Sequence, residues 1–247
     1  MLEYIMLGII QGLTEFLPVS SSGHLVIMQR ILGITEEQVA VTVILHLGTI
    51  LALVIFFFKD IINLLKDARA LFRIFIVTLI TGAIAVIGKD FFENLFSAPR
   101  LVALAWVVTG IILILTKEFT QTKRSDINIK DAVILGFTQG VAIIPGISRS
   151  GITISTLLFR GIDRKVCFAF SFLISIPLML GAAVFELKKI EFALNGAPYY
   201  LAAGFISSAV TGVVALWILM SMVKRAKLYY FGYYCVLAGI TTLLFVR

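Results

Sequence analysis

The sequence predicts an all-α integral membrane protein built from two inverted-topology repeats. Of its 247 residues, 60% are hydrophobic and only 14% are charged, with a mean hydropathy of +1.05, whereas a soluble domain is nearer a quarter charged. The apolar stretches lack the residue-by-residue alternation of a membrane barrel, so the spans are expected to be helices. Two similar polar stretches, at 11–24 and 139–153, interrupt this apolar background.

Each repeat is expected to hold a re-entrant helix–loop–helix and three transmembrane helices, giving six full spans and two re-entrant pairs. The first pair occupies 1–34, where Pro18 and the run Ser20–Gly23 end the helix. Its two apolar runs are each too short for the roughly 20 residues that a span needs. The second pair occupies about 131–160. The full spans are expected at Val39–Phe58, Leu71–Gly88, Leu101–Leu115, Val166–Phe185, Tyr199–Met222 and Tyr229–Val246.

The two halves repeat at a shift of 128 residues without a gap. Eight identities fall within residues 7 to 33: Leu7 with Leu135, Gly8 with Gly136, Gln11 with Gln139, Gly12 with Gly140, Ser20 with Ser148, Ser22 with Ser150, Gly23 with Gly151 and Gly33 with Gly161. We therefore expect one membrane domain over 1–247, with repeats 1–115 and 131–247 joined by a polar linker, 116–130. Three spans in each repeat would invert the second repeat relative to the first.

Basic residues predict the orientation. The loops at 59–73, 116–130, 160–165 and 223–227 hold fourteen lysines and arginines, against six in the remaining loops and ends. By the positive-inside rule these four loops are cytoplasmic. Both termini are then expected on the outer face of the cell membrane, and the two re-entrant pairs enter from opposite sides so that their tips can meet. The net charge of +7 is explained by this topology, and no nucleic-acid partner is expected.

The two breaks carry residues suited to binding an anion. A new half-helix is expected after each break, and serines at 20–22 and 148–150 are good N-cap residues. A helix start presents free N–H groups and the positive end of the helix dipole. Arg149 adds a planar donor fork that matches phosphate oxygens. For Ser22 and Ser150, ordinary capping and close helix packing is an equally good interpretation.

The first break also holds a carboxylate and an imidazole. Gln11 and Glu15 are four residues apart, on one helix face. Glu15 is a candidate ligand of a divalent cation, with the Gln11 amide oxygen beside it, or a group that positions a catalytic residue, or the ion-pair partner of Arg149. His24 shares a face with Ser20 and Ser21, so it is a candidate base, nucleophile or leaving-group acid, or a buried structural histidine. His46, in the first span, is expected to make an interhelical hydrogen bond, and Gln139 to support the second loop.

At these residues the chain resembles the undecaprenyl pyrophosphate phosphatase family, the bacitracin-resistance type. The first family motif corresponds to Gln11 and Glu15 followed by Pro18 to His24. The second corresponds to Pro145, Gly146, Ser148, Arg149, Ser150 and Thr153. Many relatives have a second Glu where this chain has Gln11, which leaves one carboxylate in the pair.

The resemblance implies hydrolysis of undecaprenyl pyrophosphate, a polyprenyl lipid, to the monophosphate and inorganic phosphate. This reaction recycles the lipid carrier of cell-wall synthesis and confers bacitracin resistance. It implies a divalent cation, Mg²⁺ or Ca²⁺, held by Glu15 with or without Gln11, and a site that opens on the outer face. Catalytic roles are implied for Glu15, Ser21, His24 and Arg149, with either Ser21 or His24 as the nucleophile. Substrate-binding roles are expected for Gln11, Ser20, Ser22, Ser148, Ser150 and Thr153.

Two other functions fit the same sequence. A flippase or transporter of a polyprenyl phosphate carrier is one, because inverted repeats are typical of alternating access. A proton or ion channel built on Glu15, His24 and Arg149 is the other, although serine-rich helix starts favour a bound anion. The sequence is also compatible with a homodimer.

Overall fold

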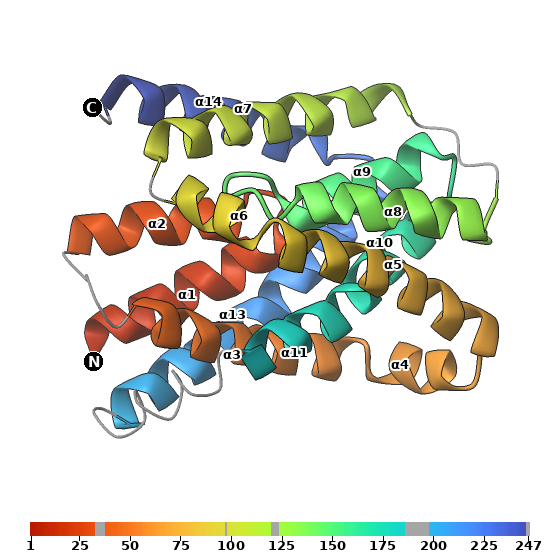
Figure 1. Cartoon of the computed structure of the whole chain (residues 1–247), viewed down its shortest axis with the longest axis horizontal. Coiled ribbons are helices and arrows are strands. Elements are labelled where there is room, and N and C mark those ends of the chain that lie inside the picture. Colours follow the sequence, from red (N-terminus) through yellow and green to blue (C-terminus); the bar gives the residue numbers. More distant parts are fainter. Residues whose placement is uncertain (33–37, 97, 120–123, 186–197, 246–247) are drawn as a thin grey trace.

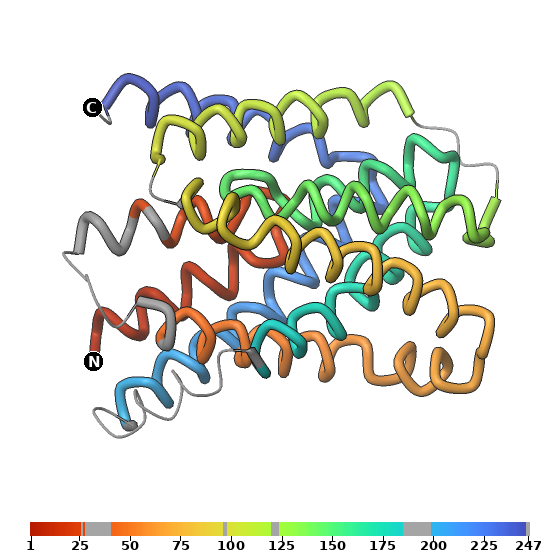
Figure 2. The backbone as a smooth tube through the Cα atoms, viewed as in Figure 1, coloured from red at the N-terminus to blue at the C-terminus, as the bar shows by residue number. Residues whose placement is uncertain are grey.

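Two broken helix pairs lie in the middle of a helical bundle (Figure 1). The computed structural model describes residues 1–32, 38–96, 98–119, 124–185 and 198–245. The first pair is α1 (Leu2–Phe16) with α2 (Ser21–Leu32), and the second is α8 (Ile129–Val141) with α9 (Arg149–Phe159). The pairs enter from opposite ends of the bundle, and their turns meet near its centre, as the backbone trace also shows (Figure 2).

The remaining helices surround the two pairs. In the first half they are α3 (Gln38–Phe56), α4 (Phe58–Leu65), α5 (Ala68–Ile87), α6 (Lys89–Phe96) and α7 (Pro99–Leu115), which ends in a 3-10 turn, η1 (Thr116–Glu118). In the second half they are α10 (Arg164–Leu173), α11 (Ser175–Phe185), α13 (Pro198–Lys224) and α14 (Tyr229–Phe245). The short helices α4 and α6 were not expected from the sequence.

Among the described residues, four helical segments are long and apolar enough to cross a membrane: 68–87, 99–118, 164–184 and 199–224. A fifth is added if α3 and α4, which are bent by 77°, form one broken span. The sixth expected span corresponds to α14, whose 17 residues fall short of the usual ~20. The expectation of six full spans is thus confirmed for four and, with the bent pair, for five.

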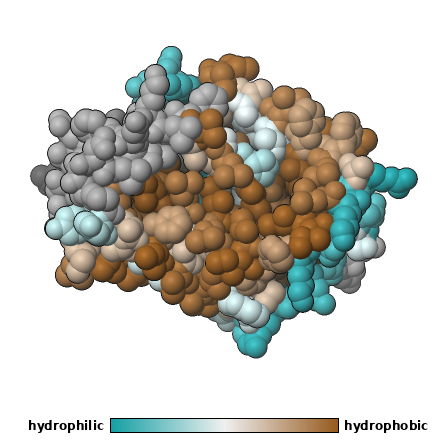
Figure 3. Space-filling view, turned by 90° about the horizontal axis from the view of Figure 1, so that it is seen from below, coloured by the Kyte–Doolittle hydropathy of each residue, from teal (hydrophilic) through white to brown (hydrophobic). Residues whose placement is uncertain are grey.

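The face of the bundle seen in Figure 3 is largely apolar, as a lipid-facing surface must be. In the most apolar 18-residue stretch of α5, only 17% is buried within the protein. Large side chains on this helix, such as Phe72, Phe75 and Leu79, are exposed. Hydrophilic residues gather at the margins of this view, most of all along its right side. Length, composition and surface together describe a multi-pass membrane protein.

Contacts between helices repeat across the two halves. Helix α1 packs against α13, α8 packs against α5, and α7 packs against α14. Thr211 Oγ1 on α13 lies 3.5 Å from the Gly8 carbonyl of α1, although its hydroxyl donates at 2.7 Å to the Ser207 carbonyl of its own helix. The hydroxyl of Thr81 on α5 donates to the Gly136 carbonyl of α8 at 3.0 Å. Gly8 and Gly136 are one of the matched pairs in the sequence.

Glycines on α1 allow the close approach of α13. A Cβ atom at Gly8 would overlap Ser207 and the Gly204 carbonyl, and one at Gly12 would overlap Thr211 and the Ser208 carbonyl. Small residues at such a crossing let two backbones pack directly within a membrane. The contact fixes the position of α1, and therefore of the polar residues at its end.

The second break is shaped by Pro145 and Gly146. Gly146 has a φ of +96°, in the left-handed region that glycine accepts freely, and a Cβ there would overlap the Val102 carbonyl of α7. The hydroxyl of Thr109 donates to the Gly146 carbonyl at 3.0 Å and accepts from the Ser148 amide at 3.1 Å. Helix α7 therefore holds both sides of this turn.

A buried ionic cluster joins the two helices of the second pair at the end that lies away from their turn. The Asp131 side chain is fully buried, and its Oδ1 accepts hydrogen bonds from Arg124 Nη2 and Arg160 Nε, both at 2.8 Å. Asn128 and Asp131 also cap each other at the start of α8. The polar linker is thus joined to the end of α9.

The start of α1 and the end of α14 lie on one side of the bundle, and the ends of α4 and α7 lie on the other (Figure 1). Several sequence expectations fall outside the described residues: Gly33 of the repeat, residues 33 and 34 of the first pair, positions 120–123 of the linker, and the last residue of the span expected to end at Val246. The division into repeats 1–115 and 131–247 stays a prediction.

Candidate active site

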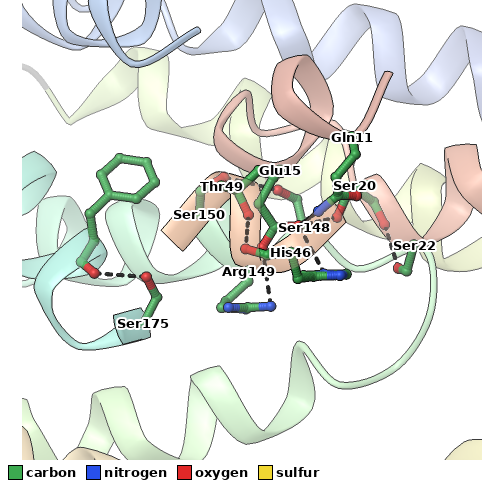
Figure 4. A network of polar contacts seen from close by, with 12 residues as sticks. Gln11, Glu15, Ser20, Ser22, His46, Thr49, Ser148, Arg149, Ser150 and Ser175 are labelled. Atoms are coloured by element: carbon green, nitrogen blue, oxygen red, sulfur yellow. Dashed lines mark hydrogen bonds and ion pairs between the residues drawn. The ribbon is translucent and has the colours of Figure 1, made fainter. Parts of the chain in front are cut away.

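The carboxylate of Glu15 is the centre of a polar network between the two breaks (Figure 4). Its Oε2 accepts hydrogen bonds from Ser21 Oγ at 2.6 Å and from Gln11 Nε2 at 3.0 Å. Its Oε1 lies 3.3 Å from Nη2 of Arg149 on α9. The side chain is only 5% exposed, so this charge is stabilised by protein groups rather than by water. Residues from both broken pairs therefore converge on one buried carboxylate.

The serines of the two breaks adopt the same arrangement. Ser20 Oγ lies 3.2 Å from Ser22 Oγ and accepts from the amide of Gly23, while Ser148 Oγ lies 3.3 Å from Ser150 Oγ and accepts from the amide of Gly151. The expected capping is confirmed at both helix starts. Thr153 is fully buried, and its hydroxyl donates to the Arg149 carbonyl at 2.8 Å, within its own helix.

Ser20 is held in an unusual backbone conformation. Its φ of +65° lies in the left-handed region, which is uncommon for a residue with a side chain. The indole nitrogen of Trp106 donates to the neighbouring Val19 carbonyl at 2.9 Å. This turn aims the next residue, Ser21, at Glu15.

His24 faces an aromatic pair rather than the carboxylate. Its Nδ1 lies 2.8 Å from the Ser20 carbonyl, and its Nε2 lies 2.6 Å from the hydroxyl of Tyr234 on α14. The ring stacks on Tyr234 and meets Trp106 edge-on, with centroids 5.0 Å apart. Both ring nitrogens have partners, so the imidazole supports the first turn in this structure. The catalytic role that the sequence suggests for His24 stays a prediction.

The histidine that lies beside the Glu15 carboxylate is His46. Its Nε2 lies 3.5 Å from Glu15 Oε2, and its Nδ1 lies 2.7 Å from the Thr42 carbonyl one turn earlier on α3. The sequence predicts a contact between helices for this residue but does not place it in the site. A polar residue within an apolar span was the available signal, because such residues are costly in a membrane.

A small pocket opens beside the network. It is lined by Glu15, Phe16, Arg149, Ser150, Ser171, Phe172, Ser175 and Met179. The first four come from the two broken pairs, and the last four come from α10 and α11. Sequence reasoning missed Ser171 and Ser175. They are four residues apart, a spacing that places two hydroxyls on one face of an apolar span.

Gln139, the counterpart of Gln11, supports the second half. Its Nε2 donates to Thr81 Oγ1 at 3.3 Å, and Thr81 in turn donates to the Gly136 carbonyl. These bonds join α8 to α5 away from Glu15. The supporting role expected for Gln139 agrees with this position.

The side chains at the site fit a divalent cation only if the substrate supplies further ligands. Within the described ranges, no three His, Cys, Asp or Glu side chains gather into a metal-binding group. Glu15 supplies one carboxylate, and the buried Oε1 of Gln11 has no hydrogen-bond partner. Hard cations prefer such oxygen ligands, and diphosphate oxygens would complete the set.

These features define a class: a multi-pass membrane protein in which a carboxylate, a serine hydroxyl and a guanidinium meet, largely buried, between two broken helix pairs. The chain belongs to the family described as bacitracin resistance protein BacA, whose pattern matches residues 4–241. Three relatives called undecaprenyl-diphosphatase cover nearly the whole chain. That of Halothermothrix orenii is 42% identical, over 96% of this chain and 95% of its own. Those of Alkaliphilus metalliredigens and Methanosphaera stadtmanae are 39% and 38% identical, each over 98% of this chain and 97% of its own.

Proposed function

We propose that this protein is an undecaprenyl-diphosphatase, which hydrolyses a polyprenyl diphosphate to the monophosphate and inorganic phosphate. The reaction recycles the lipid carrier of cell-wall synthesis and gives resistance to bacitracin. The single observation that carries the proposal is the Ser21–Glu15–Arg149 arrangement, in which a hydroxyl and a guanidinium lie on either side of one carboxylate. It is supported by the family and by relatives of that name over nearly the full length.

The geometry favours Ser21 as the nucleophile. Its Oγ would attack the terminal phosphorus and pass its proton to Glu15, whose Oε2 already accepts that hydrogen bond at 2.6 Å. The bond from phosphorus to the bridging oxygen would break, and the polyprenyl monophosphate would leave with the bridging oxygen. A water molecule would then attack the phosphoserine, release inorganic phosphate and restore the hydroxyl, and its proton would pass to Glu15. Glu15 would give the proton of the first half to the leaving monophosphate, and the proton of the second half to Ser21 Oγ as the bond from phosphorus to that oxygen breaks.

Arg149 would bind and stabilise the transferring phosphate. Its Nη2 contacts Glu15, while its Nη1 is buried and has no hydrogen-bond partner. An unpaired donor in a buried place is costly, and a phosphate oxygen would satisfy it. The serines at 20, 22, 148 and 150 would add donors around the same group. Thr153, whose hydroxyl is bonded within α9, would hold this helix start in place.

Both histidines would position other groups. As an imidazolium, with its Nδ1–H donated to the Thr42 carbonyl, His46 would also donate from Nε2 to Glu15 and so fix the carboxylate relative to Ser21. His24 would hold the turn at Ser20 through its bond to that carbonyl, with Tyr234 fixing the ring from the other side.

A divalent cation, Mg²⁺ or Ca²⁺, fits beside the carboxylate. Glu15 and the free amide oxygen of Gln11 would hold it together with diphosphate oxygens. When bound, such an ion supplies positive charge that offsets the charge of the diphosphate.

The topology proposed from the sequence has inverted repeats with both termini outside. It is supported by the matched contacts of α1 with α13 and of α8 with α5, and by the position of the start of α1 and the end of α14 on one side. The tail of the substrate would lie in the lipid, which accounts for a diphosphate site buried within the bilayer. An opening on the outer face would let the enzyme compete with bacitracin for the same diphosphate.

The experiment uses a polyprenyl diphosphate labelled with ³²P in its terminal phosphate and the purified protein in detergent. We expect release of labelled inorganic phosphate and, after an early acid quench, a label on Ser21 that is stable to acid. A label that acid removes would point to a phosphohistidine and overturn Ser21 as the nucleophile. No release by folded protein would overturn the function itself.

A further inference from the structure

One side of the pocket beside Glu15 is formed by α10, a helix with no role in the reaction proposed above. Ser171 lies on α10 and lines this pocket together with Arg149 of α9. The residue is 3% exposed, and its Oγ is fully buried without a hydrogen-bond partner. Nη1 of Arg149 is also buried without a hydrogen-bond partner. Two side chains from different helices therefore bring unpaired polar atoms to one pocket.

Unpaired buried polar atoms are rare, because each loses its bonds to water without replacement. In the described part of the chain six side-chain atoms have this status: Gln11 Oε1, Thr78 Oγ1, Gln139 Oε1, Arg149 Nη1, Ser155 Oγ and Ser171 Oγ. Of these, only Arg149 and Ser171 belong to residues that line the pocket. Their unmet bonds are thus concentrated where a ligand would lie.

The chemistry of the two groups defines the ligand. A guanidinium N–H can only donate, and a serine hydroxyl can donate as well. A group that satisfies both must be an acceptor, and the positive charge of Arg149 favours an anion with several oxygens. Ser175, on the same wall, already donates its hydroxyl to the Phe172 carbonyl at 2.7 Å, so it has no hydrogen left for such a ligand.

We propose that Ser171 is a substrate-binding residue, whose hydroxyl and Arg149 Nη1 donate to oxygens of the same phosphate group. This proposal rests on the proposed function, since it assigns one more contact to the diphosphate headgroup. It makes α10, a helix outside both broken pairs and both sequence motifs, part of the binding site. The phosphate would then be held between α9 and α10, next to the Ser21–Glu15 pair.

Ser155 offers a matched control. It is also a fully buried serine with an unpaired hydroxyl, and it lies on α9, but it does not line the pocket. Replacement of either serine by alanine removes one unpaired hydroxyl from the interior. Neither change should lower the thermal unfolding temperature, because the protein loses no hydrogen bond. Only the change at Ser171 should affect binding.

The probe is a polyprenyl methylenediphosphonate, in which a CH₂ group replaces the bridging oxygen and prevents hydrolysis. Its dissociation constant is measured by calorimetry with the full-length protein in detergent, for wild type, Ser171→Ala and Ser155→Ala. We expect Ser171→Ala to raise the constant at least about tenfold, as loss of a hydrogen bond to a charged group does. Ser155→Ala should stay within about twofold of wild type. Should Ser171→Ala fail to fold, Ser171→Cys, a similar shape with a weaker donor, is measured instead and should also bind more weakly.

The outcomes separate the two proposals. An unchanged dissociation constant in folded Ser171→Ala, or an equal loss in Ser155→Ala, would overturn the role of Ser171 and leave the diphosphatase function intact. If wild type binds the probe but does not hydrolyse the diphosphate, the proposed function fails and the serine comparison still decides the binding role. Absence of binding by wild type would overturn both.

Discussion

Oε1 of Glu15 lies 3.3 Å from Nη2 of Arg149, and this contact joins the first broken helix pair to the second. Each half of the chain supplies one charge of the pair. Neither charge is well placed without the other, because an isolated ionised group at this depth is very costly. The pair thus explains why two distant breaks in the sequence meet in one place.

The first prediction concerns the planar shape of the Arg149 guanidinium. Arg149→Lys should lower kcat/KM at least about a hundredfold, because a lysine keeps the charge but loses the planar fork that reaches both Glu15 and a phosphate. Phosphate release by the purified variant measures this. Arg225→Lys is the control, since Arg225 is exposed beyond the end of α13. A rate near that of wild type in Arg149→Lys would show that the guanidinium does not hold the phosphate.

A second prediction tests the position of His46. His46→Gln retains an N–H donor that can reach Glu15, so it should keep kcat within about tenfold of wild type. His46→Leu leaves the carboxylate without this partner and should lower kcat by a further tenfold or more at similar KM. Steady-state kinetics of the two purified variants give the comparison. Equal rates in both variants would argue against a hydrogen bond from His46 to the carboxylate.

The third prediction concerns His24 and its partner. His24→Ala should lower turnover at least about a hundredfold, since it releases the Ser20 carbonyl and the strained turn that aims Ser21. Tyr234→Phe removes only the outer bond of the imidazole, at Nε2, and should cost far less, about tenfold or under. If the two variants were equally impaired, the role assigned to the Ser20 contact would be wrong.

A fourth prediction addresses the metal. EDTA should abolish most phosphate release, and Mg²⁺ or Ca²⁺ added in excess should restore it. Gln11→Glu adds a second carboxylate beside Glu15 and should lower the cation concentration needed for half-maximal rate. Gln11→Leu should raise that concentration. Full activity in the chelator would exclude a cation from the reaction.

Much of the site was predictable from the sequence because polar residues are conspicuous in an apolar chain. Glu15 and Arg149 both stand at breaks where a proline and serines end the helix. The matched positions in the two halves indicated that the breaks belong together. The network around Glu15 brings both of these residues to one point.

The parts that were missed depend on packing. His46 and Ser171 lie in long apolar segments, α3 and residues 164–184, where apolar residues are so frequent that their periodicity does not single out these two polar residues as facing the site. The break between α10 and α11 at Ile174 also gave no strong signal, although Pro177 follows it by three residues. Short helices such as α4 depend on a bend of 77° that the apolar pattern does not record.

The most direct measurement of the central claim is inorganic phosphate release from a polyprenyl diphosphate by purified protein in detergent, where transport across a membrane cannot contribute. Wild type, Ser21→Ala and Arg149→Ala are compared, after circular dichroism has shown that all three are folded. We predict steady turnover to the monophosphate by wild type and at least about a hundredfold less by each variant. Turnover by the variants at the wild-type rate would contradict the site, and no turnover by wild type would contradict the enzyme.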